Sequence, residues 1–364
     1  MFGWKTAVFH HAIYTFHKSL SRYLTVMRQV WIKRYGDPSV LQMQDSPSPT
    51  PRSGEVRIRV DAVGVTYVDL LARMGSYVDA PAPPFIPGFE VTGVIDQVAQ
   101  GVPNLKEGDV VFAYTRLGGY SEVVCVPHKQ VFRRLEWMSS ADAVAITVHF
   151  LTAYMMLLVM GSVRQGDKVL IHGAGGGVGA AALDICNIVG AETYGTASPE
   201  KHKFLLERGL RHAIDYRNLD YEKVIMNLTG GKGVQLILDP LGGIHWPKNY
   251  RLLAPAGRLI HYGTSSEVTG KKRSLLARMR ALVMMPFYTP MKLMQDNKAV
   301  MGVNLDQVWA HSDIPRVWMK QIITWYDEAL FRPQIDKTFP FEKAAEAHHY
   351  LHDRKNIGKV LLKV

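Results

Sequence analysis

The chain has 364 residues, of which 47% are hydrophobic, and a formal net charge of +11 at pH 7 with histidines neutral. This length predicts about two globular domains. The two cysteines, Cys125 and Cys186, exclude a disulfide scaffold and a four-cysteine zinc lobe and favour a reducing compartment. The positive charge favours an anionic partner. Because no nucleic-acid-binding module is visible, a phosphorylated cofactor or an anionic membrane surface is the better match.

Residues 1–26 form an N-terminal extension that is basic, aromatic and free of carboxylates, since the first acid is Asp37. A transit peptide or a membrane-surface helix has such a composition, but no compact apolar core with a cleavage site is present. We favour the simpler interpretation that translation starts at Met27, whose next residues resemble a first strand. The extension is otherwise a targeting or disordered segment.

The pattern of residues 30–131 predicts short strands broken by glycine and proline, with little helix. Residues 55–60 alternate polar and apolar side chains, as a half-exposed strand does. The uncharged run 143–163 is long enough to resemble a membrane span. It contains several polar residues and leads directly into the next strand, so we predict a helix buried between two domains.

The sequence pattern of residues 166–179 predicts a buried strand, a glycine-rich turn and the start of a helix. Its glycines recur every third position, where such a turn needs a tight bend, bare backbone beside a pyrophosphate and close helix packing. The unpaired N–H groups of the first helical turn then form an anion site. Such turns also occur for purely structural reasons. The candidate cofactor-binding residues here are Gly173, Gly176, Gly177, Val178 and Gly179.

The next predicted strand, residues 192–196, ends where an NAD-preferring site has an acid about 20 residues after the first glycine. No acid stands there. Ser198 and Lys201 instead offer a hydroxyl and an ammonium to a 2′-phosphate, so NADPH is favoured over NADH. Alternatively, Ser198 caps the helix that starts at Pro199 and Lys201 is merely solvated, and both interpretations can hold together.

Four further strands are predicted, at residues 213–215, 235–238, 258–262 and 300–304. Six strands alternating with helices suit a doubly wound parallel sheet, which binds its ligand outside the carboxyl ends of the strands. Gly263 and Thr264 follow one of these ends. The tail, residues 336–364, returns to strand and short-helix character and is expected to rejoin the first module.

A second candidate region is the segment 271–291, which combines basic residues with leucine, methionine and phenylalanine and contains no acid. Such a basic amphipathic segment can lie on an anionic membrane. We favour the alternative that it forms a lid over the cleft or part of a dimer contact.

Taken together, these motifs give the chain a clear resemblance to a medium-chain dehydrogenase/reductase of the quinone oxidoreductase branch. The segments that carry the resemblance are 87–94, 108–111, 118–122, 151–154, 173–179 and 358–360. Within the branch, segments 195–202, 213–216, 239–243 and 355–362 resemble the vesicle amine transport protein group. The resemblance implies an α/β fold, with a GroES-like β-rich catalytic domain, a doubly wound Rossmann parallel sheet and a homodimer.

The resemblance also implies domain boundaries and further cofactor contacts. The GroES-like domain would occupy residues 27–148, the NAD(P)-binding Rossmann domain residues 149–330, and residues 331–364 would return to the catalytic domain. Thr152 would lie beside the nicotinamide, Tyr216 beside the adenosine phosphate, and Asn356 would also contact the cofactor.

The chain departs from its relatives at several positions. Zinc-dependent relatives have a cysteine ligand within the segment matching residues 64–69 and a histidine where this chain has Phe89, so no metal is expected. The quinone reductases usually have asparagine where this chain has Thr66. His149 also replaces an asparagine, and we favour a core histidine over a cofactor contact there.

The resulting hypothesis is a zinc-independent, cytoplasmic oxidoreductase that transfers a hydride from NADPH to a quinone or activated enone. Tyr67, Arg73 and Tyr77 are the candidates to line the acceptor pocket, where a tyrosine hydroxyl can donate to the acceptor oxygen. For both tyrosines, simple packing at the domain seam is an equally good interpretation. The alternative function is an NADPH-binding, membrane-associated lipid-binding or transfer protein with little turnover.

Overall fold

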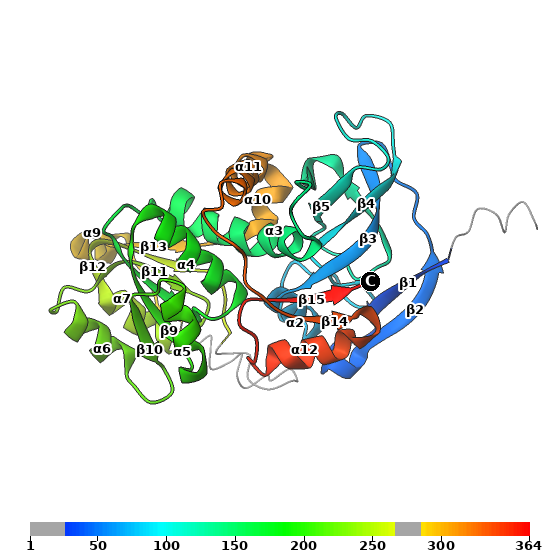
Figure 1. Cartoon of the computed structure of the whole chain (residues 1–364). Helices are drawn as coiled ribbons and strands as arrows, with labels where there is room; N and C mark the ends of the chain where they lie inside the picture. The colour runs from blue at the N-terminus through cyan, green and yellow to red at the C-terminus, as the bar shows by residue number, and fades with distance from the viewer. Residues whose placement is uncertain (1–25, 266–284) are drawn as a thin grey trace, which may run out of the picture.

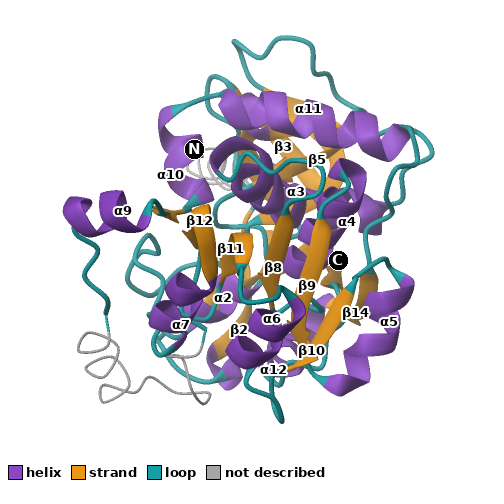
Figure 2. Cartoon of the chain, turned by 90° about the vertical axis from the view of Figure 1, so that its left-hand side faces the viewer, coloured by secondary structure: helices purple, strands orange, loops and turns teal. Residues whose placement is uncertain are grey.

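Short apolar segments build a six-stranded parallel sheet in the middle of the chain. The computed structural model describes residues 26–265 and 285–364. The strands are β8 (Lys168–His172), β9 (Glu192–Ala197), β10 (His212–Asp215), β11 (Val234–Asp239), β12 (Leu253–His261) and β13 (Ala299–Gly302). Their order, β10-β9-β8-β11-β12-β13, is that of a doubly wound nucleotide-binding sheet (Figure 2). Strand order reverses beside β8, which places the expected ligand site at its carboxyl end.

Helices connect these strands and flank the sheet. The connecting helices are α4 (Gly177–Val189), α5 (His202–Glu207), α6 (Tyr221–Leu228), α7 (His245–Leu252) and α9 (Pro290–Asp296). Two more helices, α10 (Leu305–His311) and α11 (Ile314–Asp327), follow the last strand, β13. Val169, Leu170 and Ile171 of β8 are all fully buried, because helices cover both faces of the sheet. This explains why β8 is a continuous apolar run in the sequence and does not alternate.

The second domain is β-rich and is made from both ends of the chain. Its elements are β1 (Val26–Ile32), β2 (Leu41–Pro47), β3 (Glu55–Val65), α2 (Tyr67–Arg73), β4 (Glu90–Val98), β5 (Val110–Tyr114), β6 (Val123–Pro127), β7 (Val131–Arg133), β14 (Ile335–Pro340), α12 (Ala344–His352) and β15 (Lys359–Lys363). The larger sheet runs β14-β15-β3-β4-β5-β7, so the C-terminal strands join it at one side (Figure 1). Val56, Ile58 and Val60 of β3 are buried in alternation, as the sequence pattern predicts.

Helix α3 (Ser140–Tyr154) joins the two domains and continues as a π-helical turn over Met155–Met160 (Figure 1). Within the described residues, this is the one helix long and apolar enough to cross a membrane, but 78% of its most apolar window is buried in the protein. It packs against α4, α11 and strands β3, β4 and β5. The expected boundary at residues 148/149 therefore falls inside a helix that both domains share.

A buried ion pair ties the C-terminal return to the rest of the β-rich domain. The Lys359 ammonium contacts the Glu90 carboxylate, and these side chains are 1% and 0% exposed. The other Glu90 oxygen accepts a hydrogen bond of 2.7 Å from the backbone N–H of Val148 in α3. Burial raises the pKa of Glu90, while the Lys359 charge and the Val148 N–H act in the opposite direction. Three segments far apart in the sequence thus meet at one carboxylate.

We predict that Lys359→Met destabilises the protein by about 3–5 kcal/mol, because it leaves the buried Glu90 charge without its counterion. Lys363→Met is the matched control on the same strand, since the Lys363–Asp61 pair is exposed and an exposed pair contributes about 1 kcal/mol or less. Urea unfolding followed by circular dichroism measures both losses. Equal losses in the two variants would contradict the prediction.

Candidate functional site

The glycine turn between β8 and α4 has the geometry of an anion cradle. Gly173 adopts φ +64°, which favours glycine, and a Cβ on Gly179 would lie 2.4 Å from the Gly173 carbonyl oxygen. Gly176 occupies the N-cap of α4 and provides no side-chain cap. The N–H groups of the first helical turn therefore remain free of side-chain capping and point, with the positive end of the helix dipole, toward the cleft. A dinucleotide diphosphate fits this arrangement.

A cleft of about 570 Å³ runs along the carboxyl ends of β8, β9, β11 and β12 and continues between the two domains. Most of the residues predicted from the sequence line it. They are Tyr67, Tyr77, Thr152, Gly173, Gly176, Gly177, Val178, Gly179, Ser198, Lys201, Tyr216, Gly263, Thr264 and Asn356. The cleft thus brings together residues from the glycine turn, from four strand ends, from α2 and α3 and from the C-terminal return.

At the end of the cleft beyond β9, polar and cationic groups replace the acid of an NAD site. The Ser198 hydroxyl makes no capping hydrogen bond, although the residue precedes a short helical turn. Lys201 is half-buried, and its ammonium donates to the backbone oxygen of Asn356. Burial lowers the pKa of Lys201. This lysine is therefore held at the cleft and is not merely solvated.

Two arginines that the sequence reasoning missed complete this end. Arg217 and Arg354 both line the cleft. Arg217 forms an exposed ion pair of 2.7 Å with Glu200. Each arginine directly adjoins a motif residue, since Arg217 follows Tyr216 and Arg354 precedes the segment 355–362. Their position next to these motifs in the sequence could have identified both arginines as candidates. Together with Lys201, these two arginines give the cleft three basic side chains at this end.

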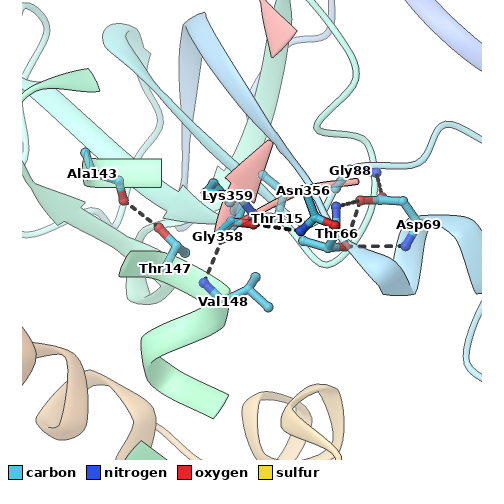
Figure 3. A network of polar contacts seen from close by, with 11 residues as sticks. Thr66, Asp69, Gly88, Thr115, Ala143, Thr147, Val148, Asn356, Gly358 and Lys359 are labelled. Carbon is cyan, nitrogen blue, oxygen red and sulfur yellow. Dashed lines mark hydrogen bonds and ion pairs between the residues drawn. The ribbon is translucent and has the colours of Figure 1, made fainter. Parts of the chain in front are cut away.

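The C-terminal return lies directly over the glycine turn. The N–H of Gly358 donates to the Gly175 carbonyl oxygen at 3.1 Å, and a short parallel bridge pairs Gly176 with Gly358. The Asn356 side-chain amide donates to the Gly358 oxygen at 2.9 Å (Figure 3). The buried Asn356 side chain thus orders its own loop, while its backbone oxygen holds Lys201. The side chain and the backbone oxygen of Asn356 therefore both help to shape the wall of the cleft.

His149 and Thr152 of α3 line the middle of the cleft. The His149 ring lies so close to Gly177 that a Cβ on Gly177 would be 1.8 Å from a ring carbon. Burial, with the nearby Lys359 charge, holds the pKa of His149 well below its usual value, so the ring is neutral at physiological pH. His149 is both buried and part of the cleft wall, which combines the two interpretations offered for it.

Tyr67 and Tyr77 border the wider end of the cleft, together with Phe89. Tyr67 begins α2, whose N-cap Thr66 forms a reciprocal capping box with Asp69. Asp69 also accepts a 2.8 Å hydrogen bond from the N–H of Gly88, which fixes the start of the segment that carries Phe89 (Figure 3). Burial raises the pKa of Asp69 to about 6. Thr66, which replaces the asparagine of the relatives, thus has a defined role in holding α2.

Arg73 does not line the cleft, which corrects the expectation from the sequence. Its side chain is fully buried, and its guanidinium nitrogens have no hydrogen-bond partner among the described residues. The nearby groups are those of Tyr120, Asp37 and His348, and burial lowers the pKa of Arg73 to about 10. Arg73 and Tyr67 are six positions apart on one helix, about 240° in direction, so the two side chains point to different sides.

Among residues 26–265 and 285–364, no three histidine, cysteine, aspartate or glutamate side chains gather as a metal-binding group. Phe89 lies in the cleft wall at the position where zinc-dependent relatives have a histidine, and its phenyl ring offers no ligand atom. The Phe89 ring packs edge-on against Tyr77 at 5.7 Å between centroids.

Family models match both domains. The model of the alcohol dehydrogenase GroES-like domain matches residues 52–136, and that of the zinc-binding dehydrogenase domain matches residues 208–362. Among characterised proteins, the synaptic vesicle membrane protein VAT-1 homolog of Rattus norvegicus is 39% identical over 92% of this chain and 84% of its own length. The quinone oxidoreductase of Homo sapiens is 30% identical over 93% of this chain and 98% of its own length.

Solved structures of related proteins have the same architecture. The human VAT-1 homolog-like protein superposes with a TM-score of 0.80 at 31% identity, covering 93% of this chain and 98% of that one. A mycobacterial protein complexed with NADPH superposes with a TM-score of 0.81 at 25% identity, covering 93% of this chain and 100% of that one. The chain therefore belongs to the medium-chain dehydrogenase/reductase superfamily, among the relatives that include the quinone oxidoreductases and the VAT-1 homologs.

Proposed function

We propose that this oxidoreductase uses NADPH and transfers a hydride to a quinone or another activated enone or carbonyl acceptor, without zinc. The observation that carries the proposal is a single cleft with two unlike ends. One end has free helix N–H groups and three cations, and the other has tyrosine hydroxyls among apolar walls. Such a cleft suits a phosphorylated dinucleotide lying next to a flat apolar acceptor.

The preference for NADPH rests on the charges at the β9 end. Lys201, Arg217 and Arg354 line the cleft beside Ser198, and β9 ends without an acid. A 2′-phosphate would receive charge-assisted hydrogen bonds from these side chains, whereas the nearby Glu200 carboxylate, which does not line the cleft, is already paired with Arg217. The mycobacterial relative complexed with NADPH supports this choice of cofactor.

The acceptor end favours a planar apolar molecule with a polarised oxygen. Val68, Leu71, Phe89, Tyr114 and Leu305 provide its apolar wall. Tyr67 and Tyr77 bring hydroxyls to the same region, where a donor stabilises the negative charge that hydride transfer creates on the acceptor oxygen. With these donors and no ligand atom at Phe89, we propose that the reaction does not depend on zinc.

We further propose that the protein is a homodimer. Strand β13 (Ala299–Gly302) lies at the edge of the parallel sheet and pairs only with β12 among the described strands. An open edge of this kind can pair with the same strand of a second copy.

A second candidate function is lipid binding at a membrane surface. Of the segment 271–291, residues 271–284 lie outside the described residues. In the described part, Met285 and Phe287 are 57% and 86% exposed, and Met291 and Met294 beyond them are also exposed. Exposed apolar side chains next to a basic stretch favour contact with an anionic membrane. The VAT-1 relatives are named as synaptic vesicle membrane proteins.

We expect the purified protein to oxidise NADPH faster than NADH when a quinone is supplied, because three cations line the end of the cleft that receives the extra phosphate. Absorbance of the reduced coenzyme, followed across a panel of quinones, enones and aldehydes, measures the rates. No turnover with any acceptor would favour the lipid-binding candidate.

Lys201→Ala should weaken NADPH binding by about 1.5–3 kcal/mol, the contribution of a hydrogen bond to a charged group, and NADH binding much less. Lys203→Ala is the control, because it removes the same charge only two positions further along the chain. The Lys203 side chain is 88% exposed. Calorimetric titration with each coenzyme gives the affinities. Equal losses for both coenzymes in the Lys201 variant would show that this lysine does not read the 2′-phosphate.

For the membrane candidate, Phe287→Ser should reduce flotation of the protein with vesicles containing phosphatidylserine, because it removes an apolar side chain that is 86% exposed. Val317→Ser is the control, an exposed apolar residue on α11. Flotation that is unchanged by Phe287→Ser would remove the described part of this segment from the membrane contact.

A further inference from the structure

A polar contact crosses the mouth of the cleft and has no role in the function proposed so far. The Tyr77 hydroxyl donates to the Oδ2 atom of Asp306, and both side chains line the cleft. Tyr77 belongs to the segment after α2 in the β-rich domain, whereas Asp306 is the second residue of α10. Asp79 accepts further hydrogen bonds from Asn304 at 2.8 Å and Gln307 at 3.0 Å. The two domains thus meet at a group that faces the acceptor end.

Asp306 is unusual because its carboxyl group is buried and, among the described residues, only one of its two oxygens has a hydrogen-bond partner. Its residue is 3% exposed, and its Oδ1 atom has no hydrogen-bond partner among the described residues. Burial raises the pKa of Asp306 to about 6; the Tyr77 hydroxyl opposes this shift and the Asp79 charge adds to it. Within residues 26–265 and 285–364, a further charged neighbour is Arg116, whose exposed side chain lies 3.9 Å from Oδ2. The raised pKa of Asp306 brings its ionisation closer to neutral pH than that of an exposed aspartate.

The protonation state of Asp306 decides where the Tyr77 proton points. A carboxylate only accepts hydrogen bonds, so ionised Asp306 engages the Tyr77 O–H. A protonated carboxyl instead donates to the Tyr77 oxygen and leaves the tyrosine O–H free for a ligand in the cleft. The same tyrosine is therefore occupied at high pH and available as a donor at low pH.

We propose that Asp306 is the positioning residue for Tyr77, and that the pair delivers a proton to the oxygen of the acceptor, an inference that rests on the proposed oxidoreductase function. A bound reduced nicotinamide would supply the hydride, which would form a C–H bond on the acceptor while the electron pair of the acceptor π system moved onto its oxygen. That oxygen takes the Tyr77 proton, and Tyr77 takes the Asp306 proton. Solvent returns a proton to Asp306. The coenzyme is oxidised and the acceptor is reduced by two electrons.

The test measures binding without turnover. We would titrate 1,4-naphthoquinone calorimetrically into the protein saturated with NADP⁺, which has no hydride to give, at pH values on either side of about 6. In the parent protein, affinity should fall about fivefold as the pH rises through this value, the factor corresponding to one hydrogen bond of about 1 kcal/mol. Asp306→Asn should abolish this pH dependence, because the amide N–H donates to Tyr77 at every pH. Its affinity should stay at the low-pH level of the parent.

Two further variants and a spectrum make the outcome unambiguous. Tyr77→Phe should bind the quinone weakly at every pH. Asp184→Asn is the control, since burial also raises the pKa of Asp184 to about 6 but this residue pairs with Arg208 and does not line the cleft. It should keep the pH dependence of the parent. In coenzyme-free protein at low pH, the infrared carbonyl band of a protonated carboxyl should be weaker in Asp306→Asn than in the parent.

The possible failures are distinguishable. If Asp306→Asn keeps the pH dependence of the parent, or if its infrared spectrum matches that of the parent, the role of Asp306 is overturned while the proposed function stands. If the parent protein binds no quinone at any pH, the proposed function is overturned and this inference with it.

Discussion

The structure depends on a single buried carboxylate, that of Glu90. The Lys359 ammonium neutralises it, the Val148 N–H donates to it, and a Cβ on Gly64 would lie only 2.2 Å from one of its oxygens. A charge excluded from water is tolerated only where such partners are all in place, and removing one partner is costly. Glu90 therefore fixes the positions of β4, β15 and α3 relative to one another. Part of the cleft wall lies on or beside these elements, including His149 and Thr152 of α3 and Gly358 just before β15.

Two consequences for the cleft follow from that arrangement. On one side, α3 places His149 directly after Val148 and Thr152 about one turn further along the helix. On the other side, the residues before Lys359 reach the glycine turn, where Gly358 bonds to Gly175 and Asn356 holds Lys201. The charge pair of one domain thus determines the shape of the coenzyme site of the other. This explains why the C-terminal segment returns to the first domain after passing beside the second.

The sequence predicted those features that local chemistry determines. The glycine turn has the same requirements wherever it occurs, so Gly173, Gly176 and Gly179 could be recognised from their spacing, and alternation in β3 and the apolar run of β8 identified the two kinds of sheet. The direction of Arg73 could not be predicted, because a seven-residue helix presents side chains on all sides. Nor could Asp306, since 229 positions separate it from Tyr77 and no sequence pattern joins them.

The two sides of the domain junction differ in composition. Along α3 the junction is apolar, with Phe150 and Leu151 buried, and Phe150 stacks on Phe331 at 4.1 Å. At the acceptor end it combines exposed hydrogen bonds from Asn304 and Gln307 to Asp79 with the stacking of Trp309 of α10 on Tyr114 of β5 at 5.7 Å. Exposed polar contacts exchange readily for water, whereas separating packed aromatic rings exposes apolar area. The hydrogen bonds to Asp79 are therefore the contacts that exchange most readily for water, whereas the packed ring of Trp309 keeps α10, and with it Asp306, close to the β-rich domain that carries Tyr77.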